Sequence, residues 1–385
     1  MPSEENPAYL HDQLITYLGN KRALLPFIDE GVQYVVERTG RRKLNVFDVF
    51  SGSGVVSRYF KQYAASVTAN DIELYSEIIN SCYLSNKDEI DMSALHSAYE
   101  ALTAAAADEL HRAGRAGFVS GFYAPRDENN VQEGERCFYT PYNARYIDTV
   151  RQLIAEMIPS GSRQFFVAPL LAEASVHANT GGVFKGFYKD SKTGRGKFGG
   201  NGLNALGRIR GTIALPFPVF SRFSCPFRIF RSDANELTAD DELYAGLPGG
   251  MFDIAYIDPP YNQHPYGSNY FMLNLIASYD RPDETEMSRV SGIPHFWNRS
   301  QYNRKKYAAE TLSFLVRSLR AKYLLVSFNS EGFIARDEMM EILGSAGEVQ
   351  VFESPYNAFR ASRNLKERPI HVSEYLYVVE KKFNT

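Results

Sequence analysis

The stretch NVFDVFSGSGVVSRYF, residues 45–60, joins an apolar run to a second apolar segment through a turn of small residues. The large apolar residues before the turn predict a buried strand. After the turn, Val56, Tyr59 and Phe60 recur at helical spacing, so a helix should follow. A strand that leads directly into a helix is one unit of an α/β fold with a parallel sheet.

Further segments of the same kind follow along the chain. Residues 66–69 predict a second strand that ends at Asn70-Asp71, and residues 72–84 have the periodicity of a helix. Later strands are expected near 227, at 252–257, at 322–332 with a loop at its end, and as an antiparallel edge hairpin of 347–354 with 373–381.

The interval between the two halves of this pattern does not fit a compact βα repeat. It contains an Ala-rich helix and a Gly-rich stretch at 181–202, and loops this long inside a domain are usually functional. We therefore predict an inserted domain, which divides the chain into residues 1–86, 87–226 and 227–385.

The composition excludes several classes of protein. Of the 385 residues, 44% are hydrophobic and 23% charged, which argues against disorder. The polar N-terminus and the absence of a run of about 18 apolar residues predict neither a signal peptide nor a membrane span, so a cytoplasmic protein is expected. Cys82, Cys137 and Cys225 are too far apart for a CxxC zinc site or a disulfide framework. The net charge of −3 speaks against a nucleic-acid partner, but only if the charge is evenly distributed.

The turn after the first strand is typical of a ligand site. Gly52 and Gly54 allow the backbone to approach a ligand at the start of a helix. Position 57, where a dinucleotide fingerprint has its third glycine, is Ser57, so NAD binding is disfavoured, and a plain tight turn remains the alternative. Asp71, at the end of the next strand, could accept hydrogen bonds from both ribose hydroxyls, and this favours a nucleoside cofactor.

The sharpest motif is Asp258-Pro259-Pro260-Tyr261, directly after the apolar run FDIAYI. Prolines cannot continue a strand ladder, so they hold the chain rigid and leave carbonyl groups free. A carboxylate beside a free carbonyl offers two acceptors to the exocyclic amine of a planar base, and the aromatic ring can stack on that base. A Pro-rich turn with a buried tyrosine is the structural alternative.

Together these motifs resemble the S-adenosylmethionine-dependent DNA N6-adenine methyltransferases of the Dam-like, alpha-ordered D12 class. The resemblance rests on YLGNK at 17–21, FSGSG at 50–54, the acid at 71, FRSDANEL around 233, DPPY at 258–261 and SFNSEG at 327–332. It implies a Rossmann-like class I methyltransferase sheet with an inserted, mostly helical target-recognition domain. It also implies a cofactor site made of Tyr17, Gly19, Asn20, Lys21, Asp48, Phe50, Ser51, Gly52, Gly54, Asp71 and Asp233.

The same resemblance implies a mechanism. The target adenine is flipped out of double-stranded DNA, Tyr261 stacks on it, and Asp258 and the Pro259 carbonyl accept the hydrogens of its amine. The amine then attacks the methyl group of S-adenosylmethionine, and neither a metal nor a protein nucleophile is required. Tyr270 and Asn329 are the candidates for the remaining wall of the base pocket.

The charge is unevenly distributed along the chain. Residues 181–231 contain ten Lys or Arg and one acid, Asp190, which gives +9 and leaves −12 for the remainder. Cations interleaved with aromatic rings suit phosphate contacts and base wedging, although a solvated basic face is the alternative. With two smaller basic sets, the predicted DNA contacts are Lys185, Lys189, Lys192, Arg195, Lys197, Arg304, Lys305, Arg360 and Arg363.

Other activities share the pocket chemistry. An N4-cytosine DNA methyltransferase, an RNA amino methyltransferase and a glutamine-methylating enzyme are alternatives, although the acid at 258 favours adenine. A DNA-binding scaffold without catalysis is a further alternative. The partners predicted are double-stranded DNA and a restriction endonuclease of the same system, with no membrane partner. The recognised DNA sequence and the oligomeric state cannot be inferred from these residues.

Overall fold

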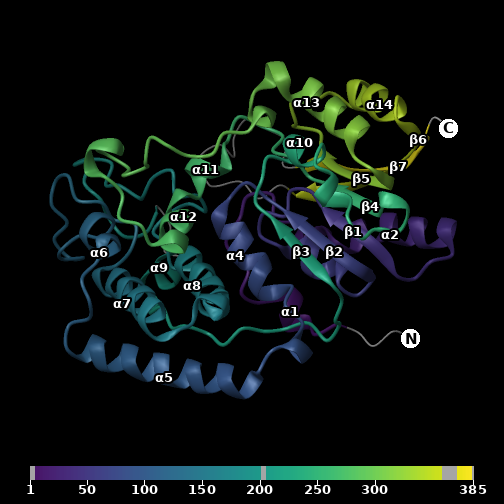
Figure 1. The fold of residues 1–385 in the computed structure, drawn as a ribbon. Helices are drawn as coiled ribbons and strands as arrows, with labels where there is room; N and C mark the ends of the chain where they lie inside the picture. The colour runs from purple at the N-terminus through teal and green to yellow at the C-terminus, as the bar shows by residue number, and fades with distance from the viewer. Residues whose placement is uncertain (1–4, 201–204, 358–370, 384–385) are drawn as a thin grey trace.

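A seven-stranded sheet forms the centre of the computed structural model, which describes residues 5–200, 205–357 and 371–383 (Figure 1). The strand order is β3-β2-β1-β4-β5-β7-β6, in which β1 to β5 are parallel and β7 runs antiparallel between β5 and β6. The strands are β1 (Leu44–Asp48), β2 (Ala64–Asn70), β3 (Phe227–Phe230), β4 (Phe252–Ile257), β5 (Ala321–Asn329), β6 (Gly347–Asn357) and β7 (His371–Lys381). The predicted α/β fold, its Rossmann-like parallel sheet and its C-terminal hairpin are therefore confirmed.

Helices cover both faces of this sheet, because neighbouring residues of each central strand point to opposite sides. Val46 packs with α2 (Leu25–Thr39) and α3 (Val55–Phe60) in one apolar core. Phe47, the next residue, packs in the other core with α10 (Ala234–Leu237), α13 (Lys305–Ser318) and α14 (Arg336–Gly344). Both faces are buried, which explains why β4 is apolar except for Asp253, a buried acid that pairs with Arg41 and Lys322.

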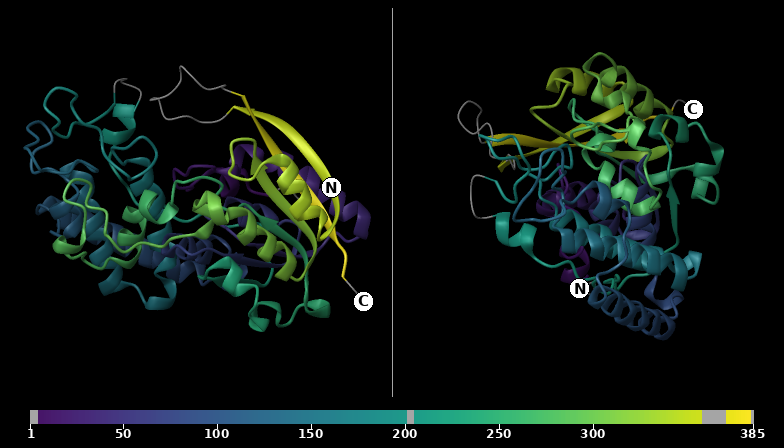
Figure 2. Two further views of the ribbon diagram at one scale, coloured as in Figure 1. Left: turned by 90° about the horizontal axis from the view of Figure 1, so that it is seen from above. Right: turned by 90° about the vertical axis from the view of Figure 1, so that its left-hand side faces the viewer.

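A helical lobe lies beside the sheet, at the left of Figure 1 and of the left-hand view of Figure 2. Its core contains residues from α1 (Pro7–His11), α4 (Leu74–Tyr83), α5 (Met92–His111), α6 (Phe118–Phe122), α7 (Pro141–Met157), α8 (Gln164–Val176) and α12 (Phe271–Ser278). α9 (Leu206–Arg210) and α11 (Tyr266–Asn269) lie in the same part of the molecule. The lobe thus combines the segment between β2 and β3 with α12, which follows the DPPY motif. None of the helices in the described ranges has the length and apolar character needed to cross a membrane.

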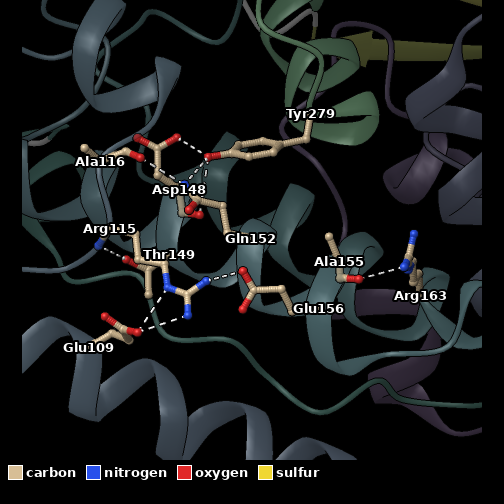
Figure 3. Close-up of polar contacts among 10 residues, drawn as sticks. All are labelled: Glu109, Arg115, Ala116, Asp148, Thr149, Gln152, Ala155, Glu156, Arg163 and Tyr279. Carbon is tan, nitrogen blue, oxygen red and sulfur yellow. Dashed lines mark hydrogen bonds and ion pairs between the residues drawn. The ribbon is translucent and has the colours of Figure 1, made fainter.

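Asp148, a buried carboxylate in α7, connects α12 to two other helices of the lobe (Figure 3). It accepts hydrogen bonds from the backbone N–H groups of Val119 and Ser120 at 3.2 and 2.8 Å, and so caps α6. The hydroxyl of Tyr279, which follows α12, donates to the same carboxylate at 2.8 Å. One side chain therefore holds α7, α6 and the end of α12 together.

Replacing Asp148 by alanine should lower the free energy of unfolding by about 3 kcal/mol. The change leaves the N–H groups of Val119 and Ser120 without their acceptor, and it leaves the Tyr279 hydroxyl only the longer contact, 3.3 Å, with the carbonyl of residue 148. Glu156→Gln is the matched control from the same network, since the Glu156 side chain is 57% exposed in its ion pair with Arg115. That change should cost less than about 1 kcal/mol. Equal effects of the two substitutions in urea denaturation would contradict the assignment.

Candidate active site

The DPPY motif lies where β4 ends, between the carboxyl ends of β1 and β5. Asp258 follows directly after the buried residue Ile257, and the backbone N–H of Phe333 donates to the carbonyl of Tyr261 at 3.0 Å. The ring of Tyr261 meets Phe328 of β5 edge-on, with centroids 5.7 Å apart. The motif is thus held by the loop and the strand that come next in the sheet.

Lys21, from the N-terminal motif at 17–21, places its ammonium group beside Asp258. Its Nζ lies 3.1 Å from Oδ1 of Asp258, and the two side chains are only 4% and 17% exposed. Burial raises the pKa of Asp258 to about 6, and Lys21 opposes that rise. Burial alone would lower the pKa of Lys21, but Asp258 and Tyr261 outweigh it and raise that pKa. Both groups are therefore charged above pH 6 and form an ion pair.

The glycine-rich turn has the backbone conformation that the sequence predicts. Gly52 and Gly54 have φ of +50° and +75°, in the left-handed region, and α3 begins at Val55. The N–H of Gly52 donates to Oδ2 of Asp71 at 2.8 Å, which ties the turn to the end of β2. Oδ1 of Asp71 accepts from the N–H of Glu73 at 2.9 Å.

Asp48 is a buried acid at the end of β1. Oδ2 accepts a hydrogen bond from Ser57 at 2.6 Å, whereas Oδ1 has no hydrogen-bond partner among the described residues. Burial raises the pKa of Asp48 to about 7, against the effect of the Ser57 hydrogen bond. An acceptor that is buried without a partner is costly to keep unless a ligand supplies a donor.

These residues surround one open cavity of about 950 Å³, a volume that includes solvent at its mouth. Of the predicted cofactor and catalytic residues, those lining it are Tyr17, Gly19, Lys21, Asp48, Phe50, Ser51, Gly52, Asp71, Asp233, Asp258, Pro259, Pro260 and Tyr261. Residues from five separate parts of the chain therefore meet at the carboxyl ends of the parallel strands, where open α/β sheets bind ligands.

Four of the predicted cofactor and base-pocket residues lie outside this lining. Asn20 caps the 3₁₀ turn Lys21–Leu24 by accepting from the N–H of Arg22 at 2.8 Å. Gly54 is the N-cap of α3. Tyr270 is fully buried behind Tyr17, with their rings stacked at 4.8 Å. Asn329 accepts from the N–H of Glu331 at 3.0 Å.

The predicted DNA contacts occupy two exposed segments. Residues 188–197 form a short hairpin: Lys189 and Gly196 pair, and Asp190 accepts from the N–H groups of Lys192 and Thr193 at 3.0 and 2.8 Å. Asp190 therefore shapes the turn that carries the cations. Lys185, Lys189, Lys192 and Arg195 are exposed and Lys197 is half-buried, and Arg304 and Lys305 are exposed at the start of α13. Arg360 and Arg363 lie outside the described residues.

Some cations of the +9 segment have structural partners instead. Arg208 donates to the carbonyls of Ala178 and Thr180 at 3.1 and 3.2 Å, and Arg228 donates to the carbonyls of Glu242 and Leu243. Arg231 forms an ion pair with Glu77 at 3.2 Å. The basic surface available to a partner is therefore smaller than the sequence count indicates.

Two acids near the cavity were missed by the sequence interpretation. Glu73 lines it, and Oε2 accepts from Asn274 and Asn298 at 2.5 and 3.3 Å; burial raises its pKa to about 7. Glu374 on β7 is 4% exposed, and its charge raises the pKa of both Lys21 and Asp258. A charged residue at an inward position of an apolar strand would have been the signal for Glu374.

The raised pKa of Asp48 predicts a pH-dependent stability. An acid whose pKa is higher in the folded than in the unfolded state stabilises the fold when protonated, so its contribution is lost as the pH rises from about 4 to about 7. Asp48→Asn has no such titration. The difference in melting temperature, variant minus wild type, should therefore increase between pH 5 and pH 8. A difference that does not change with pH would contradict burial of an unpaired carboxylate.

Comparisons with known proteins identify the family of the chain. The sequence matches the family described as D12 class N6 adenine-specific DNA methyltransferase over residues 17–194 and 232–342. It is 28% identical to the type II methyltransferase M.NlaIII of Neisseria lactamica, over 96% of this chain and 100% of that one. It is also 28% identical to M.CviAII of Paramecium bursaria Chlorella virus 1, over 95% and 98%. Identity to M.FokI of Planomicrobium okeanokoites is 25%, over 95% of this chain and 52% of that one. The chain therefore belongs to the D12 class of N6 adenine-specific DNA methyltransferases and is a transferase.

Proposed function

We propose that this enzyme transfers a methyl group from S-adenosylmethionine to N6 of an adenine flipped out of double-stranded DNA. The observation that carries the proposal is the meeting of Asp258 with Asp48 and Asp71 in a single cavity. One acid can bind an amine that reacts, and the other two can bind the ammonium and ribose hydroxyl groups of a nucleoside cofactor.

The donor set fits S-adenosylmethionine. Among the residues that the structure describes, Oδ1 of Asp48 has no hydrogen-bond partner and is suited to a cationic donor. The acids at 71 and 233 suit ribose and adenine groups. Tyr17 and the glycine-rich turn provide an aromatic and a backbone surface. When bound, this cofactor supplies an electrophilic methyl group on a sulfonium.

The protein's own part is to position the amine and to accept hydrogen bonds from it. Asp258 is charged above pH 6, so its carboxylate, with the Pro259 carbonyl, can accept the two N6 hydrogens. Two such bonds draw the nitrogen lone pair out of conjugation with the ring, which makes the amine nucleophilic. Tyr261 supplies a stacking surface for the flipped base. Positioning and directed hydrogen bonds account for most of the catalysis in this scheme.

Sequencing of DNA from cells that express the enzyme, with detection of modified bases, tests the proposal. N6-methyladenine should appear within one short sequence in cells with the wild type and be absent with Asp258→Ala. N4-methylcytosine, or no modified base, would overturn it. Purified enzyme should also transfer radiolabel from S-adenosylmethionine to unmodified plasmid DNA.

The relatives suggest the biological setting. M.NlaIII and M.CviAII are named type II methyltransferases, and a relative from Streptococcus sanguinis is named a modification methylase. We propose that this enzyme likewise protects DNA from a restriction endonuclease of the same specificity. Plasmid from expressing cells should resist type II endonucleases that cut at the methylated sequence, and cleavage there would contradict this.

The exposed segment 185–197, which includes the hairpin, should contact DNA phosphates. Replacing Lys185, Lys189, Lys192 and Arg195 by glutamine should reduce the slope of log K against log salt by about 3 to 4, since each phosphate contact contributes about 0.9. A double Lys87→Gln, Arg112→Gln variant removes two exposed cations beside α5 and serves as the control. An unchanged slope in the quadruple variant would show that the hairpin is only a solvated basic surface.

A further inference from the structure

The hydroxyl of Tyr270 lies between two segments that are far apart in the sequence. Tyr270 follows α11 directly and is fully buried. Its oxygen accepts from the N–H of Leu18 at 2.7 Å and donates to the carbonyl of Gly182 at 3.4 Å. Leu18 belongs to the N-terminal cofactor motif, and Gly182 begins the basic loop.

The neighbouring tyrosines hold the cofactor motif from the other side. Tyr266, one turn earlier in α11, donates to the carbonyl of Leu18 at 3.1 Å. The ring of Tyr17 stacks on both Tyr266 and Tyr270, at centroid distances of 4.9 and 4.8 Å. Both polar groups of Leu18 are thus bound by side chains that come immediately after the DPPY motif.

This anchoring determines where Lys21 lies. Gly19 has φ of +71°, and Asn20 caps the turn that begins at Lys21. Only two residues, Gly19 and Asn20, separate Leu18 from Lys21, whose Nζ lies 3.1 Å from Asp258. A shift of Leu18 would therefore move the cation that faces the catalytic carboxylate.

The same part of the chain also anchors the basic loop. The N–H of Phe184 donates to the carbonyl of Asn269 at 2.7 Å, next to the contact between Gly182 and Tyr270. Lys185, the first predicted phosphate contact, follows Phe184 directly.

We propose that Tyr270 is a positioning residue that holds the cofactor motif and the DNA-facing loop in one arrangement for binding. The inference rests on the proposed function. Without the hydroxyl, the N–H of Leu18 must find water, and the segment 17–21 leaves its place at the cavity. Cofactor and DNA must then restore the arrangement when they bind, whereas Asp258, Pro259 and Tyr261 keep their own supports.

Tyr270→Phe tests this, with Tyr139→Phe as the matched control. Tyr139 is also fully buried, and within the described ranges its hydroxyl has no hydrogen-bond partner. Tyr270→Phe should weaken binding of S-adenosylhomocysteine, measured by calorimetry at 25 °C, about tenfold, as expected for one buried donor left unpaired. It should also raise KM for DNA, while kcat at saturation stays within about threefold. Tyr139→Phe should match the wild type in all three.

A purely structural role would lower the melting temperature of Tyr270→Phe and leave both affinities unchanged, and this result would overturn the proposal. A large loss of kcat with unchanged KM values would overturn it as well. If the wild type neither binds S-adenosylhomocysteine nor methylates DNA, the proposed function itself fails, and the two failures can therefore be told apart.

Discussion

Replacing Asp258 by alanine is expected to lower the rate of methyl transfer by about 10³-fold or more, with the affinity for S-adenosylhomocysteine nearly unchanged. The expectation follows from the position of the carboxylate after β4, where it can accept a hydrogen bond from the attacking amine. Removing one directed hydrogen bond at the reacting group commonly costs 10²- to 10³-fold. Single-turnover transfer of radiolabel to the methylated sequence measures the chemical step directly.

Loss of the ion pair with Lys21 complicates this substitution, because alanine leaves a buried cation without its partner. Asp258→Asn keeps the size of the side chain and one acceptor oxygen, and should cost about 10²-fold. Asp253→Asn is the control, since Asp253 is a buried acid on the same strand that pairs with Lys322 and Arg41. Asp253→Asn should lower stability and leave the rate unchanged. An active Asp258→Ala enzyme would exclude the proposed mechanism.

The parallel sheet could be predicted because each of its strands is marked by a short local pattern in the sequence. Each central strand is a short apolar run that ends at a polar or small residue, and the two prolines of DPPY mark the end of β4. Residues in such turns are brought together by the topology alone, since the carboxyl ends of parallel strands share one edge. This explains why thirteen of the predicted cofactor and catalytic residues line the same cavity.

The contacts of the remaining side chains depend on tertiary packing, which spacing does not encode. Arg208 and Lys189 both lie in the basic stretch of the sequence. Arg208, however, binds backbone carbonyls, whereas Lys189 is exposed. The burial of Tyr270 behind Tyr17 brings together residues 253 positions apart. Glu374 approaches Lys21 only because β7 is inserted between β5 and β6.

Gly52→Ala is expected to weaken binding of S-adenosylhomocysteine at least about 100-fold. Gly52 has φ of +50°, a conformation that costs an L-residue about 1 kcal/mol or more. A Cβ at this position would also lie 2.9 Å from Cε1 of Tyr17. That ring cannot move aside easily, because it stacks on Tyr266 and Tyr270 and its hydroxyl lies 3.2 Å from that of Tyr75. The turn must shift instead, and the hydrogen bond from Gly52 to Asp71 moves with it.

Gly40→Ala is the control that separates backbone strain from the steric clash with Tyr17. Gly40 ends α2 with φ of +64°, and an added Cβ would meet no atom of the described residues within 4 Å. It therefore introduces a comparable backbone strain without the clash, and should lower stability while cofactor affinity stays at the wild-type value. If Gly52→Ala also only lowered stability, the turn would be a structural feature and not the cofactor loop. If its affinity loss is large and specific, the close approach of Tyr17 to the turn is the reason that glycine is required there.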